Sequence, residues 1–359
     1  MPVPGPTPGC IWNSFRASGK RHLLLTGGRG SGKTTLLGSL CPEPLPGVTT
    51  WADPGKAVYL REENTGRETV IGRFDPTLPG LENKMQPVSR GLQTLGVGAL
   101  GHCVQHPSPW VRVDEIGYLE LSCPEYCQAL RRLFEEKQVL AAVRKQDAPF
   151  LNELLHRQDV FVVDLDDPYG SAGCVMMASG LGRRFGGSKL LVPFLGKPLL
   201  SWALDATDGL FSRRVVVTRS REAAAFCAAL GVETVVHDCP GRNDTVRLGL
   251  EAVGNVTQCL FCPADQPLLS RQTVESLLLC GQNSRGCIWR PCFQGTPGAP
   301  ILFSRDYFDE LKHLPQGKGG GMVAAGHGES VRTLPVADRR ELWDIDTPEN
   351  LTELEQTMK

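Results

Sequence analysis

Two glycine-rich stretches carry the residues best suited to bind phosphates. The first, TGGRGSGKTT over 26–35, places Lys33 directly after its last glycine. The second, ASGLGRRFGGSK over 178–189, spaces Arg184 and Lys189 among its glycines. Glycine lets the backbone approach an anion closely, and the cationic side chains neutralise its charge. The sequence therefore predicts two phosphate sites, and their different spacing predicts two different reactions.

The first stretch satisfies the complete P-loop pattern, G-x4-G-K-[ST], between an apolar strand-like run and a helical pattern. We expect its backbone N–H groups and lysine to hold the phosphates of ATP or GTP, and the following threonine hydroxyl to ligate Mg²⁺. A chance glycine-rich turn is the alternative, and this context disfavours it. The predicted nucleotide-binding residues are Gly27, Gly28, Gly30, Ser31, Gly32, Lys33, Thr34 and Thr35, with Thr34 also a metal ligand.

An acidic pair follows the apolar run WVRV, where a nucleotide site needs one. Asp114 is the expected magnesium partner, and Glu115 is the candidate catalytic group that polarises an attacking water. A solvated strand end is the structural alternative for this pair.

The second stretch fits neither a P-loop nor a dinucleotide fingerprint, because its arginine and lysine would crowd a pyrophosphate held by backbone alone. Separated cations suit nucleotidyl transfer, since negative charge builds on the α-phosphate and on the departing pyrophosphate. Arg184 and Lys189 are therefore the candidate catalytic cations, and a solvated charged loop is the alternative. The predicted nucleotide-binding residues here are Ala178, Ser179, Gly180 and Gly182, and the pattern continues through Gly186.

Each stretch opens its own alternation of apolar runs and amphipathic segments, which predicts two α/β domains with parallel sheets covered on both faces. The expected organisation is a flexible Pro/Gly-rich tail over 1–20, a P-loop domain over 21–168 and a second domain over 173–359. The turn-rich sequence DDPYGSAG lies between the two domains.

Composition excludes several classes of protein. The 38 basic and 39 acidic residues are scattered and give a net charge of −1, so no broad surface for nucleic acid or anionic membrane is expected. No apolar run approaches a membrane span, and the N-terminus lacks a signal-peptide pattern. The odd count of 13 cysteines, many in apolar runs, favours reduced thiols in the cytoplasm over disulfides. The pairs Cys259/Cys262 and Cys123/Cys127 lack a second half-site for zinc.

Residues 20–166 resemble the small P-loop nucleoside-triphosphatases of thermophile origin. GGRGSGKTT, VDEIGYLEL with Gly117 and Glu120, and LGVGALGHCV carry that resemblance. It implies a three-layer α/β/α domain that binds ATP or GTP with magnesium and hydrolyses it slowly, with hydrolysis driving or gating the work of a partner.

Residues 174–359 resemble the MobA-like nucleotidyltransferases, and within them the molybdenum cofactor cytidylyltransferases. MMASGLGRRFGGSKLLVPFLGKPLL matches the family signature, with Ser179 and Phe194 as departures, and CLFCPADQPLL and ELWDIDTPENL match later motifs. The resemblance implies a Rossmann-like, GT-A-like α/β/α domain. It also implies base and ribose recognition by GRNDTVRLGLEAV, which contains the predicted nucleotide-binding residues Thr245 and Arg247.

The same resemblance implies that Asp265, at the end of an apolar strand, has catalytic and magnesium-binding roles. Asp344 and Asp346 are candidates for the second metal contact, and Asp346 is the one we assign. Capping of the last helix is the rival role for this second pair. His237 and His327 are expected to be structural or surface residues.

One departure affects the final loop. Where the family has G-D-K/R-G-G/A-R, this chain has QGKGGGMV over 316–323, with Gly317 at the aspartate position. Three interpretations are open for this loop. It remains a cofactor-binding glycine turn in which Lys318 carries the charge, its recognition of the substrate has weakened, or it is a flexible linker.

The leading hypothesis is transfer of CMP from CTP to the terminal phosphate of a molybdopterin-type cofactor, with pyrophosphate released and a molybdenum hydroxylase as recipient. Guanylyl transfer from GTP is the close alternative. The guanylyl branch usually has A/L-G-G where this chain has ASG, and it has an aspartate before lysine where this chain has GGSK. Cytidylyl transfer to a sugar or isoprenoid phosphate is a further rival. A different class of function is an NTP-driven cofactor-insertion chaperone with little turnover.

Overall fold

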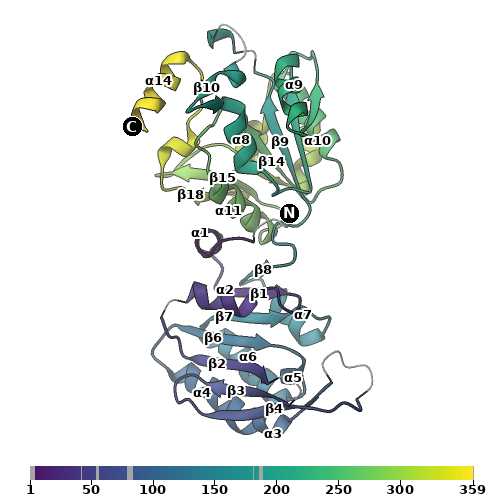
Figure 1. Ribbon diagram of the computed structural model, residues 1–359, viewed down its shortest axis with the longest axis vertical. Helices are drawn as coiled ribbons and strands as arrows, with labels where there is room; N and C mark the ends of the chain where they lie inside the picture. Colours follow the sequence, from purple (N-terminus) through teal and green to yellow (C-terminus); the bar gives the residue numbers. More distant parts are fainter. Residues whose placement is uncertain are drawn as a thin grey trace. The chain divides into compact units, whose positions relative to one another are not determined.

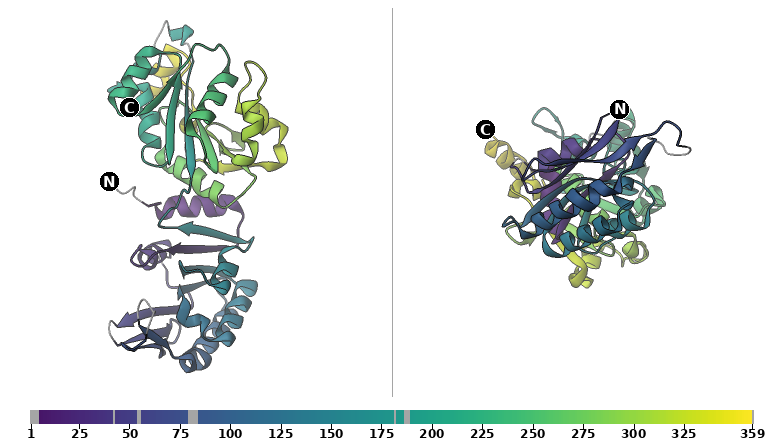
Figure 2. Two further views of the ribbon diagram at one scale, coloured as in Figure 1. Left: turned by 90° about the vertical axis from the view of Figure 1, so that its right-hand side faces the viewer. Right: turned by 90° about the horizontal axis from the view of Figure 1, so that it is seen from below.

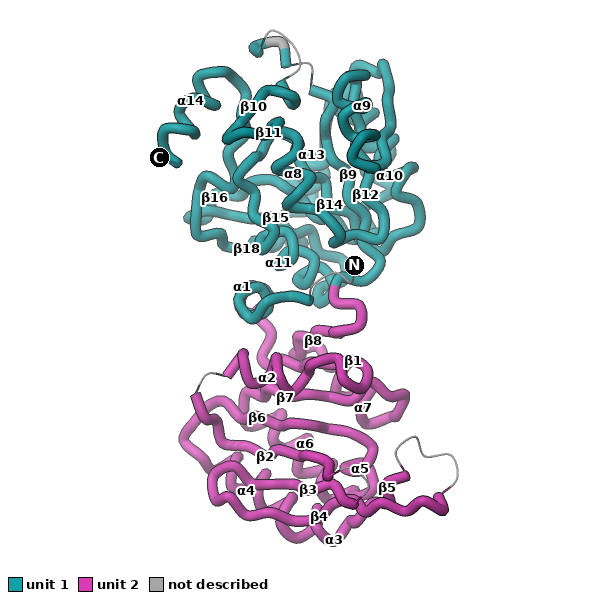
Figure 3. Tube along the Cα trace, in the orientation of Figure 1, with its two compact units in different colours: residues 1–18, 169–359 teal, residues 19–168 magenta. Residues whose placement is uncertain are grey.

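The computed structural model describes residues 5–41, 43–53, 56–78, 84–180, 182–185 and 189–358. These residues form two compact units (Figures 1 and 3). Unit 2 spans 19–168, and unit 1 combines 169–358 with the described residues before 19. None of the helices in these ranges combines the length and apolar character that a membrane crossing requires.

Unit 2 is built on one eight-stranded sheet with the order β5-β4-β3-β2-β6-β7-β1-β8. Its strands are β1 (His22–Gly27), β2 (Gly47–Asp53), β3 (Ala57–Glu62), β4 (Glu68–Phe74), β5 (Met85–Pro87), β6 (Trp110–Ile116), β7 (Gln138–Arg144) and β8 (Val160–Asp164). Its helices are α2 (Lys33–Leu40), α3 (Ser89–Gly91), α4 (Val97–Gln105), α5 (Tyr118–Leu121), α6 (Pro124–Glu136) and α7 (Pro149–Leu155).

Unit 1 is built on a second eight-stranded sheet, in which β13-β12-β9-β14-β17-β15-β16 follow one another and β18 pairs with β15. Its sheet strands are β9 (Ala172–Ala178), β12 (Arg213–Thr218), β13 (Glu233–Val236), β14 (Gln258–Pro263), β15 (Ile288–Phe293), β16 (Thr296–Pro297), β17 (Ile301–Ser304) and β18 (Val331–Pro335). A small hairpin joins β10 (Pro193–Phe194) and β11 (Lys197–Pro198). The helices are α1 (Pro8–Ser18), α8 (Leu199–Thr207), α9 (Arg221–Ala229), α10 (Arg242–Val253), α11 (Arg271–Gln282), α12 (Phe308–Lys312), α13 (Gly320–Gly326) and α14 (Pro348–Thr357).

The prediction of two α/β domains is confirmed, and Figure 2 shows each sheet with helices packed on it. The apolar runs singled out in the sequence are the parallel strands, including β1, β6, β7 and β8 of unit 2. Both sheets are mixed, however, rather than fully parallel. In unit 2, short connections join β2, β3 and β4 as antiparallel neighbours, because a parallel pair would need a longer crossover.

The expectation of a flexible tail over 1–20 is wrong for the described residues 8–18. These residues form α1, which packs against α11 of unit 1 (Figure 3). Its buried side chains recur with helical spacing, and this pattern is hard to recognise beside the Pro/Gly-rich start of the chain. The buried residues are Cys10, Ile11, Ser14 and Phe15. Ser14 Oγ also donates to the backbone oxygen of Ser276 at 3.1 Å. The segment that forms unit 2 is therefore inserted between two segments of unit 1.

Candidate active sites

The first phosphate loop turns from β1 into α2 with a backbone that requires glycine. Gly27, Gly30 and Gly32 have φ values of 150°, 76° and 89°. A Cβ on Gly27 would also lie 2.7 Å from Ser31 Oγ, closer than atoms can approach. The Ser31 hydroxyl itself is buried and has no hydrogen-bond partner among the described residues. A polar atom of this kind suits a ligand with acceptor oxygens.

Lys33 lies inside this loop. Its ammonium donates to the backbone oxygens of Gly27 and Gly28, both at 2.9 Å, and lies 3.9 Å from Glu115 Oε1. The side chain is buried, so the charge is fixed where the loop would hold phosphates. Thr35 is exposed on the first turn of α2.

The two residues predicted as metal partners, Thr34 and Asp114, lie next to each other. Thr34 Oγ1 donates to Asp114 Oδ1 at 3.1 Å, and Arg112 Nη2 lies 3.0 Å from Asp114 Oδ2. Asp114 is 1% exposed, and its two oxygens are thus held by two different partners. The sequence pattern missed Arg112, although its position two residues before Asp114 on β6 places it on the same strand face.

Glu115 lies at the edge of the loop beside a cavity of about 430 Å³. Its carboxylate is 3.4 Å from Arg144 Nε, and its backbone N–H donates to Thr50 Oγ1 at 3.0 Å. A second acidic residue, Asp166, accepts the Gly28 N–H at 2.9 Å and lies 3.1 Å from Lys145. No motif in the sequence pointed to Asp166.

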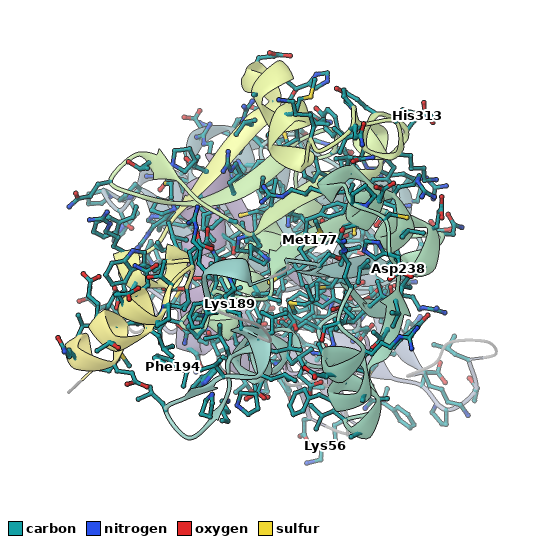
Figure 4. All side chains as sticks on the ribbon, turned by 90° about the horizontal axis from the view of Figure 1, so that it is seen from above. Lys56, Met177, Lys189, Phe194, Asp238 and His313 are labelled. Atoms are coloured by element: carbon teal, nitrogen blue, oxygen red, sulfur yellow. The ribbon has the colours of Figure 1, made fainter. Side chains whose placement is uncertain are left out.

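In unit 1, the second loop leaves the carboxyl end of β9 and borders a cavity of about 690 Å³. Gly182 has a φ of 56°, and Gly186 of the pattern lies outside the described residues. Lys189 and Met177, both labelled in Figure 4, line this cavity. The predicted residues that line it together with Lys189 are Ala178, Ser179, Gly180, Gly182, Arg184, Thr245, Asp265, Asp344 and Asp346.

Lys189 joins two acidic segments that are distant in the chain. Its ammonium lies 2.6 Å from Asp265 Oδ2 and 3.4 Å from Asp346 Oδ1. Asp344 lines the same cavity, and burial, followed by the nearby Asp265 carboxylate, raises the pKa of its carboxyl group. Ile345 N donates to the Asp265 backbone oxygen at 3.0 Å, which fixes the two segments side by side. Across the part of the chain that the structure describes, no three His, Cys, Asp or Glu side chains converge as a metal site.

Comparison with known proteins now identifies this unit. Residues 174–331 match the family model of the MobA-like NTP transferase domain. A molybdenum cofactor guanylyltransferase of Ectopseudomonas mendocina is 31% identical over 184 residues, which cover 49% of this chain and 88% of the relative. The chain belongs to the MobA-like NTP transferase family. The purine catabolism protein PucB of Bacillus subtilis is 27% identical over 200 residues, 51% of this chain and 96% of that protein.

Unit 2 has its own relatives. Residues 52–168 match the NTPase family model, in a range that begins after the P-loop. The nucleoside-triphosphatase THEP1 of Thermotoga maritima is 28% identical over 151 residues, 40% of this chain and 86% of the relative. The predicted resemblances to the P-loop nucleoside-triphosphatases and to the MobA-like nucleotidyltransferases are confirmed, whereas the relative from Ectopseudomonas mendocina is named a guanylyltransferase and not a cytidylyltransferase. A THEP1-like NTPase domain is thus inserted in a MobA-like transferase.

A histidine that we expected to be structural or at the surface contacts the second phosphate loop. His237 is buried, and its Nε2 lies 2.9 Å from Ser179 Oγ and 3.5 Å from Thr245 Oγ1. Ser179 Oγ donates to the Val217 backbone oxygen, so Nε2–H is the donor to Ser179. Burial lowers the pKa of His237, which favours this neutral form. His237 therefore holds the Ser179 side chain in one orientation.

The cations of the MobA-like cavity differ in part from the expected set. Arg219 and Arg242 line it, whereas Arg247 is absent from the described lining and lies 3.1 Å from Glu251. Gly319 also lines the cavity, and a Cβ there would lie 2.7 Å from Arg242 Cδ. The final glycine loop therefore forms part of the cavity wall and leaves room for Arg242. Lys318, the predicted charge of that loop, is exposed.

Proposed function

We propose that unit 1 transfers CMP from CTP to the terminal phosphate of a molybdopterin-type cofactor and releases pyrophosphate. The observation that carries this proposal is the convergence of Arg184, Lys189, Asp265 and Asp346 on one cavity from separate segments. The membership of the MobA-like family supports the reaction class. Unit 2, in the same proposal, binds ATP or GTP with Mg²⁺ and hydrolyses it.

The residues of unit 1 divide the work of nucleotidyl transfer. Glycines 180 and 182 allow the triphosphate to approach the loop, while Arg184 and Lys189 offset the charge that builds during attack at the α-phosphorus. Asp265 and Asp346 already converge on one cation, the Lys189 ammonium, and their oxygen donors also suit Mg²⁺. Bound there, Mg²⁺ would orient the α-phosphate and the acceptor phosphate and neutralise their charge.

In unit 2, Thr34 and Asp114 would hold Mg²⁺ and its water, since a hydroxyl and a carboxylate lie within 3.1 Å of each other beside the loop. Lys33 would neutralise the β- and γ-phosphates, and Glu115 would orient the attacking water. All thirteen cysteines are free thiols, which supports placing these reactions in the cytoplasm.

The lack of the guanylyl branch's glycine at position 179 favours CTP over GTP as the donor. The guanylyl branch of the family usually has glycine at this position, whereas here a hydroxyl held by His237 occupies the loop. GTP is the second candidate, because the relative from Ectopseudomonas mendocina is named a guanylyltransferase. A Ser179→Gly variant would remove the hydroxyl and is expected to raise the activity with GTP relative to CTP.

Pyrophosphate release tests this proposal, measured with purified molybdopterin and either CTP or GTP. Release with CTP supports cytidylyl transfer, and release with GTP alone establishes the second candidate. Cofactor binding without release from either nucleotide would overturn the transferase assignment and favour an NTP-driven insertion chaperone. Co-purification of a molybdenum hydroxylase with this chain would test the proposed recipient.

A further inference from the structure

The function proposed above assigns no ligand to the cavity of about 430 Å³ in unit 2, although Glu115 lines it. We call it the side cavity. It lies among β2–β5, β6 and α5, and its volume falls in the range of small-molecule sites, roughly 300–1,000 Å³. The side chains that define it here are Trp51, Phe74, Tyr118, Arg29, Lys84 and Arg144.

Aromatic side chains give the side cavity a wall suited to a flat ligand. The Trp51 ring stacks on Tyr59 with centroids 5.4 Å apart and an interplanar angle of 16°, so its orientation is already fixed. Phe74 is 39% exposed although it is large and apolar. A planar heterocycle would cover this exposed apolar surface and could contact a tryptophan ring whose orientation is already fixed.

The polar side chains of the side cavity favour an anionic group on that ligand. Arg29, Lys84 and Arg144 supply three cations, of which Arg144 pairs with Glu115 at 3.4 Å, and Glu120 is the second carboxylate. Glu120 is buried and accepts the Gly117 N–H at 2.8 Å. Burial raises the pKa of Glu120 to about 7, so near neutral pH it carries only part of its charge.

The side cavity lies at the γ-phosphate end of the nucleotide site. Glu115 lines the cavity and is also 3.9 Å from the Lys33 ammonium, which is fixed by the phosphate loop. In P-loop proteins this lysine reaches the β- and γ-phosphates. A molecule in the side cavity would therefore sit next to the group that leaves during hydrolysis.

We infer that the side cavity binds a second small molecule beside the NTP: a planar heterocycle that carries a phosphate or carboxylate group. A nucleoside monophosphate and an acidic pterin both have this chemistry. The inference goes beyond the proposed function, which assigns only NTP, Mg²⁺ and water to unit 2.

The test uses the full chain saturated with a non-hydrolysable ATP analogue and Mg²⁺. Pterin-6-carboxylate and guanosine 5′-monophosphate are titrated separately, and tryptophan fluorescence and calorimetry follow binding. We expect saturable binding of one probe, with the fluorescence change lost in Trp51→Phe because the reporting ring is replaced. The probe that binds identifies the source of the ligand.

Two variants and one control sharpen this test. Lys84→Ala and Phe74→Ala should each weaken binding about fivefold to tenfold, since each removes a contact at an exposed position that the fold tolerates. Lys56→Ala is the matched control and should bind as the wild type does, because Lys56 is 73% exposed and pairs with Asp53 at 3.1 Å.

Three results would overturn the inference: no saturable binding of either probe, unchanged binding in both cavity variants, or binding only when the ATP analogue is absent. The last result would make the side cavity part of the NTP's own site. ATP hydrolysis and pyrophosphate release, measured on the same preparations, show separately whether the proposed function holds.

Discussion

The two phosphate loops begin alike and then hold their lysines in opposite ways. Each follows the carboxyl end of a buried strand, β1 in unit 2 and β9 in unit 1. In unit 2, Lys33 is held by carbonyl oxygens of its own loop. In unit 1, Lys189 is held by carboxylates from the end of β14 and from the segment before α14.

This difference separates a local site from an assembled one. Most of the phosphate cradle of unit 2 lies within a few consecutive residues, and Asp114 and Glu115 add one further segment. The transferase cavity needs the loop after β9, the start of α10, the end of β14 and the chain before α14. A local cradle suits cleavage at the end of a triphosphate, and an assembled cavity offers room for a second substrate.

The largest expected effects come from removing one charged group from each site. Lys33→Ala should lower phosphate release by unit 2 about 10²–10³-fold, because one fixed transition-state donor is typically worth that much. Pyrophosphate release by unit 1 should persist in that variant. Asp265→Ala should give the reverse pattern. Both products are measured on each preparation of the full chain.

The control for this pair is the double variant. It should lose both activities, each to the same extent as in the corresponding single variant. If either single change removed both activities, the division between a hydrolytic and a transferase site would be wrong.

For the local site, the sequence pointed to the P-loop residues and the acidic pair, because these follow fixed spacings, and it missed Arg112 and Asp166. In the assembled site, spacing alone pointed to Arg184 and Lys189, whereas Asp265 and Asp346 came from family motifs. Arg219 was missed, although it follows β12 directly and β12 is the parallel neighbour of β9. Neighbouring parallel strands bring their carboxyl ends to one sheet edge, so this signal was present. Arg242 could not be predicted from the sequence, because its place in the cavity wall depends on the small size of Gly319, which is distant in the sequence.

The inserted arrangement of the units predicts an effect on stability. Ile11 of α1 is fully buried, and Ile11→Ala should destabilise unit 1 by about 2–5 kcal/mol, as large-to-small core changes do. Unit 2 should unfold as in the wild type, since α1 belongs to unit 1. Denaturant unfolding, followed by loss of each activity, measures the two units separately.

The matched control is Leu100→Ala, a fully buried position in unit 2. It should shift the unfolding of unit 2 and spare unit 1. Equal shifts of both units in either variant would show that they unfold together.

The buried carboxyl group of Glu120 makes the stability of unit 2 depend on pH. Its pKa is about 7 in the folded protein against an ordinary value of 4.5, so the folded state binds the proton more tightly than the unfolded state. The stability of unit 2 should therefore fall as pH rises from about 4.5 to 7, by up to roughly 3 kcal/mol. Urea unfolding at several pH values measures this slope.

The Glu120→Gln variant lacks this titrating group. Its free energy of unfolding should therefore increase relative to that of the wild type as the pH rises. The comparison is needed because burial lowers the pKa of His22 to about 4, and this group makes stability rise with pH between about 4 and 6.5. His22 is present in both proteins, so its contribution cancels in the difference. Parallel pH profiles of the two proteins would contradict the role of Glu120.

The smallest expected effects distinguish the cations of the assembled site. Arg219 lines the cavity, so Arg219→Ala should raise the KM for the nucleotide about tenfold, in line with loss of a charge-assisted hydrogen bond. Arg247 pairs with Glu251 on the same helix, an exposed i,i+4 contact of little energetic weight, so Arg247→Ala should change KM less than twofold. Steady-state pyrophosphate release measures both variants. A larger increase in KM for Arg247→Ala than for Arg219→Ala would mean that Arg247 leaves Glu251 to contact the nucleotide, as first expected from its motif. The residues that line the cavity would then not be the full set of cations that bind the nucleotide.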